Sequence, residues 1–75
     1  MTNIDDVFIN DVGKRLKELR SKSNLTQKAL AEKVNISEAT VARCERGETL
    51  LDTTSLVYIA EFFNVTTDYL LGLED

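Results

Sequence analysis

The chain has 75 residues, a net charge of −4, no proline, no histidine and a single cysteine. A chain of this length forms one domain and buries only about 60% of its unfolded surface, so a partner subunit would add stability. One cysteine without histidine excludes a disulfide within the chain and argues against a Cys/His metal site. Three glycines and no proline also disfavour a turn-rich all-β fold.

The positive charges are confined to one segment. All nine Lys and Arg lie between residues 14 and 46. In the segments before and after these residues, every charged side chain is acidic. Such segregation indicates a face that binds a polyanion, even though the total charge is negative. The alternative is a chance scatter of surface charges.

The first helices follow from the spacing of apolar residues and from their expected caps. Residues 1–8 are expected to form a flexible N-terminal arm, and residues 9–75 a single domain. Ile9, Val12, Leu16 and Leu19 recur at helical spacing and predict a helix over residues 10–22. Thr26 is the expected N-cap of a helix over residues 27–34, and Asn35 suits the left-handed turn after it.

Three further helices complete the expected fold. Ser37 is a good cap for a helix over residues 38–46, which Gly47 ends. Asp52 precedes an apolar helix that ends at Asn64, and Thr66 precedes a short helix over residues 67–71. The sequence therefore predicts an all-α fold of five short helices. The longest apolar run, residues 56–60, is far too short to span a membrane.

The helices over residues 27–34 and 38–46 are joined by only three residues. So tight a connection is typical of a helix-turn-helix, in which the second helix enters the major groove of DNA. Val41 and Cys44 would face inward on that second helix, leaving Glu38, Ala39 and Arg43 on an outer side. Arg can bind guanine, Glu can accept from cytosine and Ala can contact a thymine methyl group.

Residues 25–48, LTQKALAEKVNISEATVARCERGE, closely resemble the Cro/CI-type (XRE-like) helix-turn-helix domain of phage repressors and bacterial transcriptional regulators. The upstream RLKELRSKSN and the downstream IAEFFNVTTDYLLG are similar to the same domain, so the resemblance covers about residues 12–73. It implies a compact five-helix bundle of the lambda-repressor type and a cytoplasmic protein encoded by a bacterium or a phage.

The resemblance also implies roles for individual positions. Those expected to read bases are Glu38, Ala39 and Arg43, and those expected to contact the DNA backbone are Thr26, Gln27, Ser37, Thr40 and Arg46. Gln27 would also brace the recognition helix. Arg20 and Glu45 match a buried ion pair, although both could be ordinary solvated charges. Glu48 stands where the family often has a basic residue, and Asp52 where it often has proline.

The expected function is sequence-specific binding of double-stranded DNA by a homodimer on a palindromic operator. The apolar residues Leu51, Val57, Tyr58, Phe62, Tyr69 and Leu73 exceed what one small core can absorb, so a dimer contact is expected there, chiefly through Tyr58, Phe62, Tyr69 and Leu73. The alternative is a protein-interaction module, or the antitoxin of a toxin–antitoxin pair.

An enzyme is not expected, because the chain has no histidine, no nucleotide-phosphate motif and no paired carboxylates on a credible cleft. No cofactor, metal or small-molecule effector is indicated either. Cys44 could act as a redox sensor in the recognition helix, but a cysteine at an inward position is more often part of the core.

Overall fold

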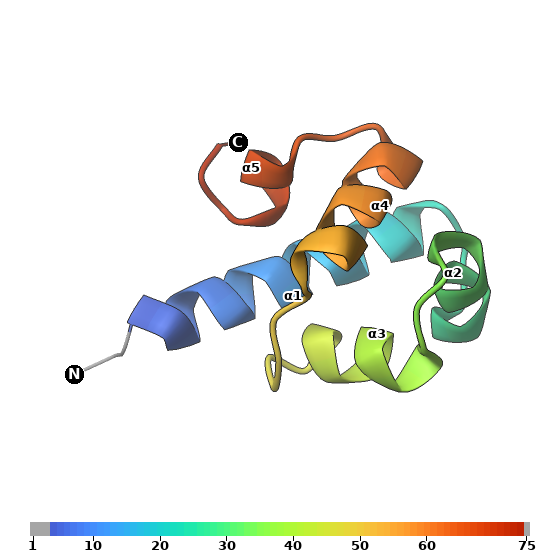
Figure 1. Cartoon of the computed structure of the whole chain (residues 1–75), viewed down its shortest axis with the longest axis horizontal. Helices are drawn as coiled ribbons and strands as arrows, with labels where there is room; N and C mark the ends of the chain where they lie inside the picture. Colours follow the sequence, from blue (N-terminus) through green and yellow to red (C-terminus); the bar gives the residue numbers. More distant parts are fainter. Residues whose placement is uncertain (1–3, 75) are drawn as a thin grey trace.

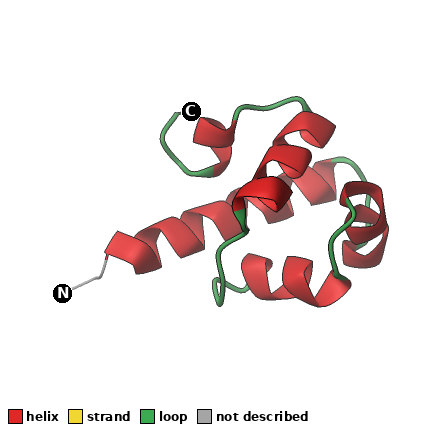
Figure 2. Cartoon of the chain, viewed as in Figure 1, coloured by secondary structure: helices red, strands yellow, loops and turns green. Residues whose placement is uncertain are grey.

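The computed structural model describes the backbone of residues 4–74 and the side chains of residues 11–74. The described chain forms five helices joined by short loops, without strands (Figures 1 and 2). Their bounds are α1 Ile4–Lys22, α2 Gln27–Val34, α3 Glu38–Glu45, α4 Thr53–Phe63 and α5 Thr67–Leu70. The predicted all-α class is confirmed. None of these helices is both long and apolar enough to cross a membrane.

The start of α1 differs from the prediction. The helix begins at Ile4 rather than near residue 10, so residues 4–8 are helical and not part of a loose arm. Neither proline nor glycine interrupts residues 4–12, and nothing in the local backbone chemistry ends the helix at residue 10. This first half of α1 extends beyond the other helices at the left of Figure 1. Residues 1–3 of the predicted arm lie outside the described residues.

The predicted caps set the starts of the other four helices. The side-chain oxygens of Thr26, Ser37, Asp52 and Thr66 each accept a hydrogen bond from the backbone N–H three residues later, at 2.7–3.0 Å. These bonds satisfy donors that a helix start leaves without a partner. At the ends of α1, α2 and α4, asparagine at residues 24, 35 and 64 adopts the left-handed conformation.

The core joins all five helices. Its buried apolar residues are Val12, Leu16, Leu30, Ala31, Val34, Val41, Cys44, Ile59, Ala60 and Leu70. Helix α3 packs against α1 and α2, while α5 packs against α1 and α4. In Figure 1, α3 runs below α1 at the edge of the molecule and leaves its lower side uncovered. One face of α3 is therefore fixed by the core, and the opposite face is free.

The contact between α1 and α3 depends on Gly13. A Cβ atom added to this buried glycine would lie 2.1 Å from the backbone oxygen of Cys44, closer than any side chain can approach. The two helices can meet at this distance only because residue 13 has no side chain. The sequence prediction gave Gly13 no role, although an isolated glycine inside a helical apolar pattern often has a packing reason.

Candidate nucleic-acid interface

Helix α3 has an inner and an outer face. Val41 and Cys44 lie three residues apart and are fully buried. Glu38, Ala39 and Arg43 are exposed, as predicted for base-reading positions, and Arg46 is exposed at the end of the helix. Ala39, Arg43 and Arg46 follow one another at intervals of four and three residues, so they share one side of the helix.

The first turn of α3 carries an ordered pair of hydroxyl groups. The Ser37 Oγ accepts a hydrogen bond from the Thr40 backbone N–H at 3.0 Å, and the two hydroxyl oxygens lie 2.7 Å apart. Their positions are therefore fixed before any ligand arrives. A helix N-terminus with free backbone donors also favours negative charge, so this turn suits a phosphate group.

The loop after α3 forms a second wall beside the outer face. Ser37, Thr40 and Arg43 line a hollow whose other side includes Thr49 and Leu50 of this loop. Leu50 is one of the few large apolar side chains that are exposed. The sequence prediction did not include Thr49 or Leu50. The sequence feature that could have identified Leu50 is its position, because it is a large apolar residue outside any helical apolar pattern.

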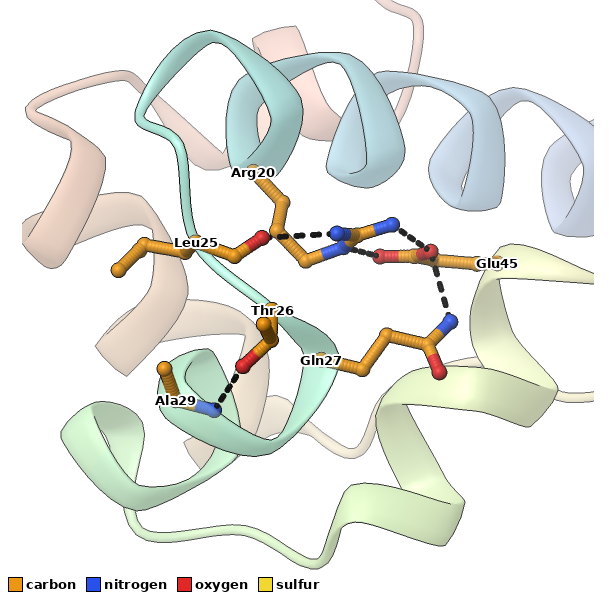
Figure 3. A network of polar contacts seen from close by, with 6 residues as sticks. All are labelled: Arg20, Leu25, Thr26, Gln27, Ala29 and Glu45. Atoms are coloured by element: carbon orange, nitrogen blue, oxygen red, sulfur yellow. Dashed lines mark hydrogen bonds and ion pairs between the residues drawn. The ribbon is translucent and has the colours of Figure 1, made fainter.

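A network of polar side chains ties α3 to the rest of the domain (Figure 3). Arg20 of α1 donates to both carboxylate oxygens of Glu45, from Nε at 2.7 Å and from Nη2 at 2.9 Å. Its Nη1 donates to the Leu25 carbonyl at 2.8 Å. The Glu45 side chain is only 3% exposed and that of Arg20 15%. The hydrogen bonds to Glu45 raise the pKa of Arg20.

Gln27 joins this network from the first residue of α2. Its Nε2 donates to Glu45 Oε1 at 3.0 Å, and Figure 3 shows the side chain reaching from α2 toward α3. Glu45 thus receives three hydrogen bonds from two other helices, which fixes the end of α3 relative to α1 and α2. The second Nε2 proton of Gln27 is not used in this contact, so Gln27 can still donate a hydrogen bond to a phosphate, as predicted.

Arg46 forms an ion pair with Glu48, two residues further along the chain. Both side chains are exposed, at 57% and 52%. The hydrogen bond to Glu48 raises the pKa of Arg46, and the same bond lowers the pKa of Glu48, with a smaller contribution from the charge of Arg43. A side chain predicted to contact phosphate therefore already has an anionic partner within the protein.

The residues predicted for a dimer contact divide into two groups. Val57, Tyr58, Phe62 and Leu73 are all exposed, with Tyr58 46% and Phe62 42% accessible one turn apart on α4. Leu51, which was not among the four residues chiefly expected in the contact, is partly buried and packs against the core. Sequence could not separate the two groups, since all six are apolar residues near the C-terminal end.

Tyr69 contacts α1 within the domain. The Arg15 guanidinium of α1 lies 4.4 Å from the centre of its ring, and the residue is half-buried. A cation over an aromatic face is attracted by the ring quadrupole, so this contact contributes to holding α5 on α1. Tyr69 is thus engaged within the domain, and its part in a dimer contact stays a prediction.

Cys44 is part of the core. Burial, with a smaller contribution from the nearby charge of Glu45, raises the pKa of its thiol to about 11. The thiol is therefore protonated and inaccessible, which disfavours a redox role. Within the described side chains, no three His, Cys, Asp or Glu residues are grouped in a way that could hold a metal ion.

Known proteins match most of the chain. Residues 16–70 match the model of the helix-turn-helix family HTH_3. The HTH-type transcriptional regulator ImmR of Bacillus subtilis is 45% identical over 85% of the chain and 50% of its own length. The HTH-type transcriptional activator BcrR of Enterococcus faecalis is 37% identical over 87% of the chain and 32% of its own length. The chain thus spans half or less of these two relatives.

The fold agrees with a solved structure. The P22 c2 repressor protein, solved in complex with a synthetic operator, superposes with a TM-score of 0.79 at 28% identity, over 84% of this chain and 96% of its own. The prediction that the chain is no enzyme agrees with the relatives, which are named as transcriptional regulators. The chain belongs to the HTH_3 (XRE-like) family of helix-turn-helix transcriptional regulators.

Proposed function

We propose that the chain binds double-stranded DNA in a sequence-specific manner, with α3 in the major groove. The observation that carries this proposal is the exposed face of α3, which offers Glu38, Ala39 and Arg43 while the helix is held rigidly from behind. A rigid support matters because base contacts discriminate only when the side chains are held at a defined position. The similarity to a repressor solved with its operator supports the same assignment.

The exposed side chains form two groups, one expected to contact bases and one expected to contact the phosphate backbone. Arg43 would bind guanine O6 and N7, Glu38 would accept from cytosine N4, and Ala39 would contact a thymine methyl group. The residues assigned to the phosphate backbone are Thr26, Gln27, Ser37, Thr40 and Arg46. Backbone contacts fix the register of the protein on the duplex but do not read its sequence.

The test begins with selection of bound sites from a random duplex library, followed by titration of Arg43→Ala and Arg46→Ala. Arg43→Ala should lose about 1–3 kcal/mol per half-site and flatten the preference at one operator position. Arg46→Ala should weaken all sequences alike and reduce the salt slope by about one per subunit. Lys22→Ala is the control, because Lys22 is exposed at the end of α1 and its loss changes the net charge equally.

Two results would contradict the assignment. If Arg43→Ala binds every single-base variant of the operator with the preferences of the parent, α3 does not read bases through this residue. If Lys22→Ala reproduces the loss seen with Arg46→Ala, the effect reflects net charge and not a phosphate contact at the end of α3.

The proposed active form is a homodimer on a two-fold operator, in contact through α4 and the residues after α5. The exposed apolar side chains Tyr58, Phe62 and Leu73 support this, because a small monomer gains by covering them. The acidic charge of this end also keeps it away from phosphates. Such a regulator would act in the cytoplasm of a bacterium.

Sedimentation measures the dimer directly. The parent should reach dimer at high micromolar concentration, and Phe62→Ser should shift it toward monomer without loss of helix content. Lys33→Ser is a suitable control, because Lys33 lines the same surface hollow as Phe62 but is not apolar. A parent that stays monomeric with and without operator DNA would exclude this dimer.

The alternative function is a protein-interaction module or an antitoxin. The pairing of Arg46 with Glu48 favours it, because it reduces the positive charge available to phosphates. A protein-interaction module without DNA binding of its own would show no affinity for random duplex DNA even at low salt. Titration therefore separates this module from a DNA-binding regulator, whereas a DNA-binding antitoxin would bind the duplex as the regulator does.

A further inference from the structure

The end of α3 places a carboxylate against the cations of its outer face. Gly47 adopts a positive φ of 76°, and the backbone N–H groups of Gly47 and Glu48 donate to the Cys44 and Arg43 carbonyls at 3.0 and 2.9 Å. These two bonds form a Schellman motif, in which the chain reverses over the last turn of the helix. The reversal brings residue 48 back toward Arg43 and Arg46.

Fold stability does not account for this carboxylate. An exposed ion pair contributes little to stability, because water screens it and two long side chains must be ordered. A negative charge at a helix C-terminus is also disfavoured by the helix dipole. The Schellman motif itself uses only backbone groups of residue 48. The side chain of Glu48 is therefore free to serve something other than the fold.

We propose that Glu48 competes with DNA phosphate for Arg46 and reduces the positive potential around Arg43, and so limits the affinity of the chain for any duplex. The Glu48 carboxylate pairs with Arg46 in the free protein, so a phosphate can bind Arg46 only by displacing it. This competition weakens binding to any duplex. Operator DNA still binds through base contacts that random DNA cannot make, so the competition keeps random binding weak while operator binding persists.

This inference rests on the proposed DNA binding, and a double-mutant cycle tests it. Parent, Glu48→Gln, Arg46→Ala and the double variant are titrated against operator and random duplex at several salt concentrations. Glu48→Gln should raise affinity for random duplex on the order of two- to fivefold per subunit, the range of exposed ion pairs. It should steepen the salt dependence and raise operator affinity by a similar factor, because the cost of displacing Glu48 from Arg46 is the same for both duplexes. In the Arg46→Ala background most of the gain should disappear.

Glu18→Gln is the matched control, because Glu18 is exposed on α1 and the change in charge is identical. An equal gain with Glu18→Gln, or an undiminished gain without Arg46, would overturn the inference and leave the proposed function intact. A parent that binds no duplex would overturn both. Melting temperatures of Glu48→Gln and the parent should agree, since the Schellman motif keeps its backbone bonds.

Discussion

Glu45→Ala is expected to destabilise the domain more than any exposed substitution. The change removes the acceptor of two hydrogen bonds from Arg20 and one from Gln27. Arg20 keeps its bond to the Leu25 carbonyl, but its charge remains without a counterion at a position only 15% exposed. Breaking a buried pair in this way costs about 3–5 kcal/mol. The remaining exposure of Arg20 places the expected loss near the lower end of that range.

This loss is large relative to the total stability. A domain of this size has about 4–11 kcal/mol of unfolding free energy, so roughly 3 kcal/mol is a substantial fraction. In melting temperature, each 1 kcal/mol corresponds to about 4–8 °C for so small a domain, and the decrease should exceed about 12 °C. Circular dichroism melts and urea titrations at pH 7 measure both quantities.

Matched variants separate the ion pair from a general effect of mutation. Glu45→Gln keeps the size of the side chain and one acceptor, so it should be intermediate between parent and alanine. Glu38→Ala removes an exposed glutamate from the same helix and should stay within about 0.5 kcal/mol of the parent. The combined Arg20→Ala/Glu45→Ala variant should lose less than the sum of the single changes. If Glu45→Ala melts within about 2 °C of the parent, the network does not hold α3 as described.

Three further predictions concern the core, a cap and the thiol. Gly13→Ala should lower the free energy of unfolding by about 1–3 kcal/mol in urea titrations, because the new methyl group would overlap the Cys44 carbonyl. This loss is expected despite the better helix propensity of alanine. The control Ser21→Ala, at an exposed position of α1, should be nearly neutral. Hydrogen bonds from Ser55 lower the pKa of Asp52 below its ordinary value of 3.8, so ionised Asp52 contributes stability above that value and loses it as pH falls through the lowered pKa. In thermal melts, Asp52→Asn, which retains a cap, should therefore be less stable than the parent at pH 6. Below pH 3.8 the stabilities of the two proteins should become similar, and a difference that does not change with pH would contradict this. The Cys44 thiol, whose pKa burial raises to about 11, should react with iodoacetamide at pH 8 far more slowly in the native protein than in urea, and equal rates would show that it is accessible.

The sequence alone determined where four of the five helices begin. Thr26, Ser37, Asp52 and Thr66 act on backbone donors only three residues away, so their effect is readable without knowledge of the fold. The ends of α2 and α4 were equally predictable, because Asn35 and Asn64 adopt a left-handed conformation that few other residues accept. The apolar spacing likewise identified the inner face of α3.

Only the tertiary structure decided the features that depend on distances between helices. The family resemblance implied a pairing of Arg20 with Glu45 and a bracing role for Gln27, but only the structure shows that Gln27 donates to Glu45 itself. The role of Gly13 required the approach of the Cys44 carbonyl, which local patterns do not encode. Likewise, Leu51 is partly buried against the core while Phe62 is exposed, although both are apolar. Local chemistry fixes helix ends, whereas burial and close approach depend on how separate helices pack.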